Sequence, residues 1–139
     1  MIKYNIDNID RIIKDSGKQV VLFGAGQIGE MCLFAMRQKK IKVDFFCDSM
    51  ERKQGVDFNG IKTLSPDDLN KLDPETNIFI SNNYVSVINE QLKKNNFKNI
   101  YDCVELFEKT DFNSSKLTLQ PAKIERWAAF YKNMTLKDE

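Results

Sequence analysis

The sequence predicts an α/β fold, a doubly wound parallel sheet of about five strands with helices on both faces. Three observations predict it. Short apolar runs rich in β-branched and aromatic residues alternate with amphipathic segments at helical spacing. The connections between these segments are short. A glycine-rich turn at Gly24–Gly29 joins the first apolar run to the next amphipathic segment. With right-handed crossovers, the expected strand order is 3-2-1-4-5.

The first half of the chain supplies two predicted helices and three predicted strands. Isoleucines at helical spacing predict a helix over Asn5–Ser16, which Gly17 ends. The polar stretch Ser49–Gly60, which contains Gly55 and Gly60, predicts a loop or a small turn-rich excursion. The other predicted elements are a strand at Val20–Phe23, a helix at Gln27–Gln38, a strand at Ile41–Cys47 and a short strand at Ile61–Leu64.

The second half continues the alternation of strands and helices. Ser65–Asp68 predicts the start of a brief helix, because serine suits the cap and proline the first turn. Asn77–Ser81 and Asn99–Cys103 predict two further buried strands. We expect the helix between them to be capped by Asn82 or Asn83.

The chain is predicted to carry one α/β domain and an added helix. The α/β domain is expected to occupy residues 1–110, and the polar residues 111–120 predict a linker. Trp127 and Tyr131 belong to an amphipathic pattern that predicts a C-terminal helix within 121–139. This helix can pack on the sheet or pair with another chain, and both interpretations stay open.

Composition excludes several classes of function. The 21 Lys+Arg and 20 Asp+Glu residues nearly cancel, which argues against a nucleic-acid partner. There is no histidine, the commonest general base and metal ligand. The N-terminus is too polar for a signal peptide, and no apolar run reaches membrane-spanning length. We therefore expect a cytoplasmic protein without a membrane partner.

The three cysteines are Cys32, Cys47 and Cys103, and each stands alone in an apolar context. The chain has no C-x-x-C pattern, so neither a zinc site nor a redox pair is predicted. An odd, scattered set of cysteines is typical of a reducing compartment. No metal site is expected.

The run VVLFGAGQIG ends in the G-x-G-x-x-G arrangement at the junction of a strand and a helix. In this arrangement Gly24 permits the tight turn, Gly26 lets the main chain approach a pyrophosphate, and Gly29 lets the helix pack close to the sheet. Main-chain amides and a helix N-terminus can hold a phosphate there. A glycine-rich turn that forms without any ligand is the alternative. We predict a Rossmann-like nucleotide-binding domain.

An acidic residue stands at the distance that the dinucleotide motif requires. Asp48 follows the second predicted strand, and its carboxylate can accept hydrogen bonds from a ribose diol. Asp48 would repel a 2′-phosphate, which favours NAD over NADP. Arg52 and Lys53 nearby keep NADP possible, although a solvated loop is the favoured interpretation of these two residues.

The next loop at the same edge of the sheet is Ser81-Asn82-Asn83-Tyr84, whose polar side chains could contact a ligand or cap a helix. We expect cofactor-binding residues in the glycine-rich turn, at the end of the second strand and in this loop. The predicted set is Gly24, Ala25, Gly26, Gln27, Ile28, Gly29, Asp48, Ser49, Ser81, Asn82 and Asn83.

No catalytic set is visible. Short-chain dehydrogenases that modify sugars need a tyrosine and a lysine four residues apart on a helix, but Ile88 follows Tyr84 and Glu105 follows Tyr101 at that spacing. Cys47 has no basic neighbour and is predicted to be a buried apolar residue rather than a nucleophile. We predict no catalytic activity for this chain alone.

Three runs, VVLFGAGQIGEMCLFAM, VDFFCDSMERKQGVDFNGIKTLSPDDL and NIFISNNYVSVINEQLKKNNFKNIYD, resemble a family of small Rossmann-like modules. Such modules are the N-terminal domains of bacterial polysaccharide-biosynthesis enzymes: nucleotide-sugar dehydratases, sugar acetyltransferases, sugar methyltransferases and radical-SAM proteins. The resemblance covers roughly Lys18–Asp102. It implies pattern positions at Gly24, Ala25, Gly26, Gly29, Asp48, Gly55 and Gly60.

The resemblance implies a module that binds NAD(P) or a nucleotide-sugar and serves surface polysaccharide or sugar modification. No acyltransferase repeat, methyltransferase domain or iron–sulfur motif follows Asp102, so we expect an N-terminal domain of a longer protein with a downstream catalytic domain, or a homodimer. Two alternatives stay open. The chain could be an NAD(P)-dependent sugar oxidoreductase, or an interaction domain that binds no nucleotide.

Overall fold

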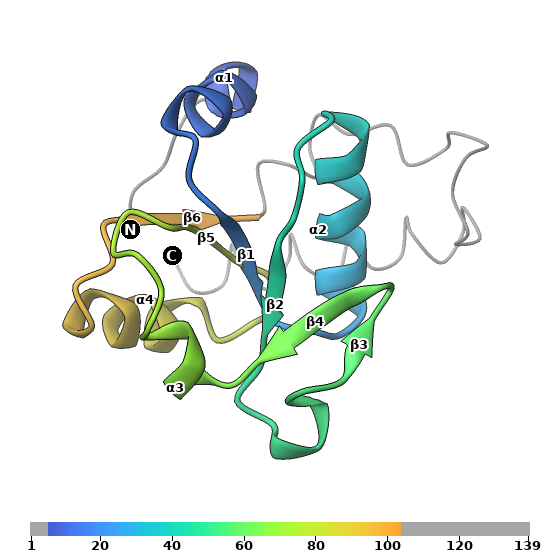
Figure 1. The fold of residues 1–139 in the computed structure, drawn as a ribbon, viewed down its shortest axis with the longest axis vertical. Helices are drawn as coiled ribbons and strands as arrows, with labels where there is room; N and C mark the ends of the chain where they lie inside the picture. Colours follow the sequence, from blue (N-terminus) through green and yellow to red (C-terminus); the bar gives the residue numbers. More distant parts are fainter. Residues whose placement is uncertain (1–5, 104–139) are drawn as a thin grey trace.

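The computed structural model describes residues 6–103, in which helices flank both faces of a twisted sheet (Figure 1). The predicted linker at 111–120 and the predicted C-terminal helix at 121–139 lie outside the described residues. In chain order the elements are α1 Ile6–Ser16, β1 Val20–Phe23, α2 Gln27–Gln38, β2 Phe45–Cys47, the 3₁₀ helix η1 Glu51–Lys53, β3 Asp57–Phe58, β4 Ile61–Leu64, α3 Pro66–Leu69, β5 Asn77–Ile80, α4 Val85–Lys94 and β6 Asn99–Asp102.

The sheet has the order β3-β4-β2-β1-β5-β6. All neighbouring strands are parallel except the β3–β4 pair. The five parallel strands thus have the predicted order 3-2-1-4-5, which confirms a Rossmann-like, doubly wound α/β fold. In the register, Phe23 lies opposite Cys47 on one side and Ile80 on the other. The residues that follow these three strand ends, Gly24, Asp48 and Ser81, therefore come together at one edge of the sheet.

Two predicted elements differ from the structure. The sixth strand, β3, lies in the stretch predicted to be a loop or a small turn-rich excursion, where no strand was expected. It exists because Asn59 (φ 53°) and Gly60 (φ 83°) form a two-residue hairpin turn of the kind that positive φ angles favour. The second parallel strand begins at Phe45 rather than Ile41. Before it, the Asp44 side chain accepts a hydrogen bond from the main chain of β1, at Val20 N–H.

Helix ends follow the predicted chemistry at two places and depart from it at one. Gly17 follows α1 with φ 63°, the left-handed conformation expected of a C-terminal glycine. The Ser65 hydroxyl caps α3 by accepting a hydrogen bond from the Asp68 N–H. The predicted asparagine cap of α4 is wrong: the helix begins after Tyr84 without a side-chain cap. Asn82 instead accepts a hydrogen bond from the Tyr84 N–H, because its side chain folds back on its own turn.

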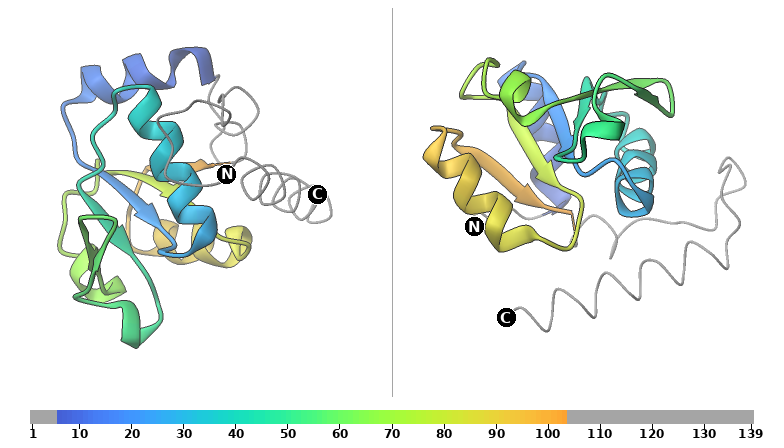
Figure 2. Two further views of the ribbon diagram at one scale, coloured as in Figure 1. Left: turned by 90° about the vertical axis from the view of Figure 1, so that its right-hand side faces the viewer. Right: turned by 90° about the horizontal axis from the view of Figure 1, so that it is seen from below.

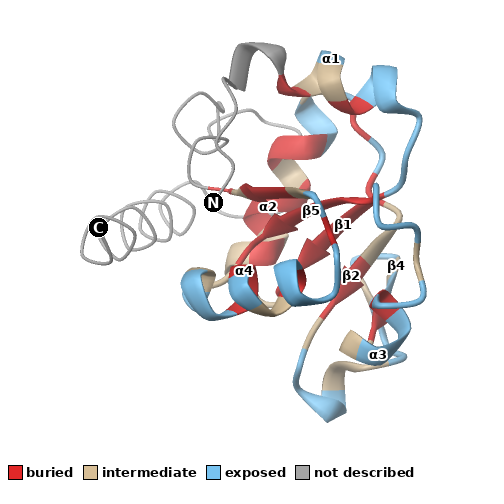
Figure 3. Ribbon diagram, turned by 90° about the vertical axis from the view of Figure 1, so that its left-hand side faces the viewer, coloured by how far each residue is buried: buried red, intermediate tan, exposed pale blue. Residues whose placement is uncertain are grey.

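Helices lie on both faces of the sheet, and its central strands are buried (Figures 2 and 3). Alternate side chains of β1 belong to two separate layers of the core. Val20 and Leu22 pack with buried residues of α1 and α2 on one face of the sheet. Val21 and Phe23 pack with buried residues of α3 and α4 on the other face. A central strand buried on both sides is what a parallel sheet requires. None of the helices within residues 6–103 combines the length and the apolar character needed to cross a membrane.

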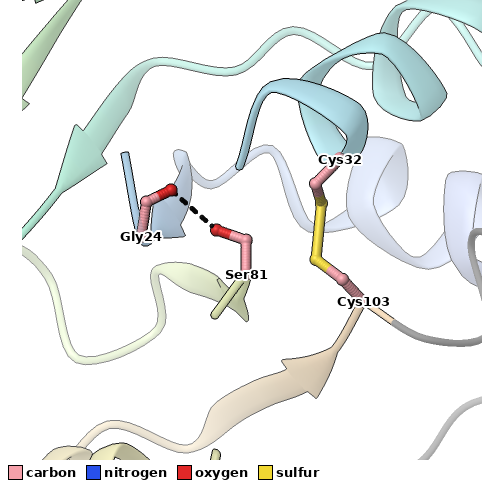
Figure 4. The surroundings of a disulfide bond; sticks show 4 residues. All are labelled: Gly24, Cys32, Ser81 and Cys103. Carbon is pink, nitrogen blue, oxygen red and sulfur yellow. Dashed lines mark hydrogen bonds between the residues drawn. A yellow bond between two sulfur atoms is a disulfide. The ribbon is translucent and has the colours of Figure 1, made fainter. Parts of the chain in front are cut away.

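Two cysteines that are distant in sequence form a disulfide, Cys32–Cys103 (Figure 4). The expectation that each cysteine stands isolated is therefore wrong for Cys32 and Cys103. Cys32 lies in α2, and Cys103 follows β6; the fold brings them together across 71 positions, a separation at which no spacing pattern is readable. The pairing also removes the support that scattered cysteines gave to a reducing compartment, because disulfides persist in oxidising ones. Cys47 is the free, buried cysteine of the described chain.

Candidate functional site

The turn after β1 depends on Gly24 for its shape. Gly24 has φ 132°, a conformation that L side chains rarely adopt. Its N–H donates to the Cys47 carbonyl at 2.7 Å, and its own carbonyl accepts from the Ser81 hydroxyl at 3.0 Å (Figure 4). A Cβ at this position would collide with the main-chain carbonyl of Ser81. Gly24 therefore fixes the first turn between the ends of β2 and β5.

The other two glycines of the motif, Gly26 and Gly29, have different surroundings. A Cβ on Gly29 would collide with the Gly24 carbonyl and would lie 3.1 Å from the Phe46 ring, so Gly29 lets α2 approach the sheet. Gly26 has an extended backbone with φ −131°. A Cβ there would meet only the Lys53 ammonium nitrogen, at 3.6 Å. Gly26 is thus the glycine of the turn that adjoins open space rather than packed main chain.

The N-terminus of α2 presents main-chain donors at this open space. Gly26 is the N-cap residue and supplies no side chain to cap the helix. The N–H groups of Gln27 and Ile28 donate no hydrogen bond to any acceptor in residues 6–103. Unpaired N–H groups at a helix N-terminus carry partial positive charge and attract anions.

A cavity of about 260 Å³ lies at the carboxyl ends of β1, β2 and β5. This is where doubly wound folds bind their ligands. Nine of the eleven predicted site residues line it, together with Lys53. The lining residues are Gly24, Ala25, Gly26, Gln27, Ile28, Asp48, Lys53, Ser81, Asn82 and Asn83.

The predicted site residues outside the lining are Gly29 and Ser49. Gly29 serves the packing of α2, as described above. Ser49 is exposed, because the chain turns away from the sheet once the side chain of Asp48 has turned inward. Ser49 therefore does not belong to the cavity.

Asp48 connects the first turn to the loop after β2. Its Oδ2 atom accepts a hydrogen bond from the Ala25 N–H, and its Oδ1 atom accepts one from the Met50 N–H, each at 2.9 Å. The Lys53 ammonium lies 3.8 Å from Oδ2. The Asp48 side chain is only 14% exposed. The carboxylate is therefore held in place by main-chain donors.

Lys53 is the cavity residue that the sequence analysis did not select. The favoured interpretation was a solvated loop, yet the side chain is 31% exposed and reaches back to the cavity. The loop is ordered by local hydrogen bonds: the Lys53 N–H donates to the Met50 carbonyl, and the Gln54 side chain donates to the Asp48 carbonyl. The available sequence signal for Lys53 was its place, with Arg52, a few residues after Asp48.

The loop after β5 closes the third side of the cavity. Ser81 is 1% exposed, and its hydroxyl is occupied by the Gly24 carbonyl. Asn82 is engaged with the Tyr84 N–H, whereas Asn83 is exposed. Ser81 thus holds two strand ends together, and Asn83 has the freest polar side chain of this loop.

The titratable side chains that line the cavity are Asp48 and Lys53. Cys47 lies beneath it in the core, where burial, with Asp48 and Asp68 nearby, raises the pKa of its thiol far above the ordinary value. The thiol is therefore protonated at neutral pH and is a poor nucleophile. Within residues 6–103, no group of three or more His, Cys, Asp and Glu side chains could hold a metal ion.

Comparisons with known proteins place the chain in a family and among known folds. The family model described as C2185-like, N-terminal, matches residues 16–100, which is more than half of the chain. We found no curated protein that matches the sequence.

Among solved structures, UDP-D-quinovosamine 4-dehydrogenase from Vibrio fischeri is similar over 60% of this chain and 75% of its own, with 22% identity and a TM-score of 0.50. RSP, a Rex-family repressor, is similar over 71% of this chain with 15% identity and a TM-score of 0.47; this chain spans 53% of it. RSP in complex with beta-NADH gives 15% identity, a TM-score of 0.44 and 54% of that chain. The first of these likenesses supports the Rossmann-like fold.

Proposed function

The chain belongs to the C2185-like N-terminal family, and we propose that it is a nucleotide-binding module whose ligand occupies the cavity at the first turn. One observation carries the proposal: the main chain from Gly24 to Ile28 borders an open cavity with unpaired N–H groups at a helix N-terminus. A phosphate is the ligand group that such a terminus favours. The ligand class is NAD(P) or a nucleotide-sugar.

The size of the cavity supports a binding mode in which only part of the ligand lies inside it. Pockets for whole small-molecule ligands usually enclose about 300–1,000 Å³, and this cavity encloses about 260 Å³. We expect the phosphates to lie in it, against Gly26 and the N-terminus of α2. Asp48 would meet the ribose, because each of its carboxylate oxygens has accepted one hydrogen bond and can accept another. The base or the sugar would lie outside, near Asn83.

The names of similar proteins suggest the setting in which this module binds its nucleotide. The family is described as an N-terminal domain, and one structural neighbour is named as an enzyme of a UDP-sugar. We propose that the module binds its nucleotide on behalf of a longer protein of sugar or surface-polysaccharide modification, as a homodimer or joined to a catalytic domain.

A thermal-shift series tests the proposal. The purified chain is heated with NAD, NADP, UDP or UDP-sugars at about 100 times the dissociation constant, where binding adds about 2.7 kcal/mol to the free energy of unfolding. The expected result is a rise of roughly 10 °C in Tm with one ligand class. Gly26→Val should abolish the rise and leave the unliganded Tm close to that of the wild type. No shift with any of these ligands would contradict nucleotide binding and favour an interaction domain.

A further inference from the structure

The cavity holds two opposite charges that are not equally engaged. Both oxygens of Asp48 accept main-chain hydrogen bonds, from Ala25 and from Met50. Lys53 has an ion pair with Asp48 at 3.8 Å, but its ammonium donates no hydrogen bond to an acceptor in residues 6–103. An ammonium carries three donors, which water or a ligand can satisfy. Asp48 is therefore held in the wall of the cavity, where each oxygen can still accept one hydrogen bond, and Lys53 is the cation whose donors remain open to a ligand.

The position of Lys53 relates it to the phosphate-binding turn. Its ammonium nitrogen lies 3.6 Å from the point that a Cβ of Gly26 would occupy, on the open side of the turn. Gln27 and Ile28, whose N–H groups donate no hydrogen bond within residues 6–103, line the same cavity. The N-terminus of α2 and the loop after β2 thus both bring hydrogen-bond donors with positive or partial positive charge to the same cavity.

The main chain holds this lysine in reach of the turn. Lys53 closes η1, where its N–H donates to the Met50 carbonyl at 3.0 Å, and its own carbonyl accepts from the Val56 N–H at 3.3 Å. Asp48 fixes the beginning of the same loop through the Met50 N–H. The loop therefore presents the ammonium from a fixed base, with the flexible side chain free to move a short way toward a ligand.

We propose that Lys53 is a phosphate-binding residue of this cavity, and that its ammonium turns from Asp48 to the 5′-phosphate chain of a bound nucleotide. The proposal rests on the proposed function and goes further, because it names the residue that distinguishes a phosphorylated ligand from its nucleoside. Asp48 keeps its main-chain partners in the exchange, so the first turn retains its shape.

Calorimetric titration of the full chain tests the assignment. The probes are ADP and UDP, with adenosine and uridine as the matched ligands that lack phosphate. The variant Lys53→Met keeps an unbranched side chain, one atom shorter, and removes its charge. Lys62→Met is the control, since Lys62 is an exposed lysine of β4 that does not line the cavity.

Lys53→Met should bind ADP or UDP about 10- to 100-fold more weakly than the wild type, the loss expected for a hydrogen bond to a charged group. Nucleoside affinity should stay unchanged, Lys53→Arg should restore most of the phosphate-dependent affinity, and Lys62→Met should match the wild type. Added salt should weaken nucleotide binding more in the wild type than in Lys53→Met.

The outcomes separate this inference from the proposed function. Tight binding of ADP or UDP to both the wild type and Lys53→Met would overturn the role of Lys53 and leave nucleotide binding intact. An equal loss for nucleoside and nucleotide would also overturn it, since the lysine would then support the cavity rather than the phosphate. If the wild type binds neither nucleotide nor NAD, the proposed function fails and this inference fails with it.

Discussion

Gly24→Ala should mainly lower the stability of the fold, whereas Gly26→Ala should mainly lower the affinity for the ligand, because the two glycines have different surroundings. At Gly24 the φ of 132° costs a non-glycine residue about 1–3 kcal/mol. The collision of the new Cβ with the Ser81 carbonyl adds about 1–3 kcal/mol of overpacking. Gly24→Ala should therefore lower the free energy of unfolding by about 2–6 kcal/mol, a large share of the stability of a small domain.

Gly26→Ala should change stability little. The backbone there is extended, and the new Cβ would make an ordinary contact at 3.6 Å with the flexible end of Lys53. Replacing glycine by alanine at an N-cap costs about 1 kcal/mol or less. Binding should suffer instead, because the methyl group stands between the main chain and the phosphate. We expect at least about a tenfold loss of affinity for the ligand that the thermal-shift series identifies.

Urea unfolding followed by circular dichroism, together with calorimetric titration, measures both effects in the two variants. The reasoning about the turn is refuted if Gly24→Ala unfolds at the same urea concentration as the wild type. Undiminished affinity in Gly26→Ala would refute the placement of the phosphate against the main chain.

Two further predictions concern the scaffold. The Cys32–Cys103 disulfide closes a loop of about 71 residues, so Cys103→Ala should lower the free energy of unfolding by about 4 kcal/mol in the chain-entropy model. Urea unfolding with and without reductant measures this effect. Equal midpoints for the variant and the wild type would contradict it. The hydrogen bond from Lys18, and a second one from the Glu75 N–H, lower the pKa of Asp73 below its ordinary value of 3.8. The stabilisation from this exposed pair is therefore present above pH 3.8 and is lost as the pH falls through the lowered pKa. Asp73→Asn should thus be less stable than the wild type at pH 7 and equally stable in acid.

Much of the fold could be predicted because its signals are local. The apolar run at Val20–Phe23, the glycine at Gly17 and the Ser65-Pro66 helix start each follow from the chemistry of a few neighbouring residues. The order of the parallel strands then follows from the handedness of the crossovers. The β3 hairpin was missed although Asn59-Gly60 is a turn signal, because a two-residue strand has no periodicity to read.

The rest depends on contacts between distant segments. The Cys32–Cys103 pairing joins a helix to the end of the last described strand, and nothing at either cysteine indicates its partner. Lys53 looks like a loop lysine until the fold places it beside Asp48 and Gly26. The set of cavity residues was predictable where the motif fixed it, in the first turn, and less so where side-chain direction decided, as at Ser49.

The most direct test of nucleotide binding at the first turn is a ¹⁵N–¹H NMR titration of the chain with NAD and with a UDP-sugar. The amide signals of Gly26, Gln27 and Ile28 should shift most as ligand is added, because their N–H groups are the proposed phosphate donors. The amide signals of the α4 residues beyond Ile88 should not shift. Saturating shifts elsewhere with an unmoved first turn, or no shifts at all, would contradict the account.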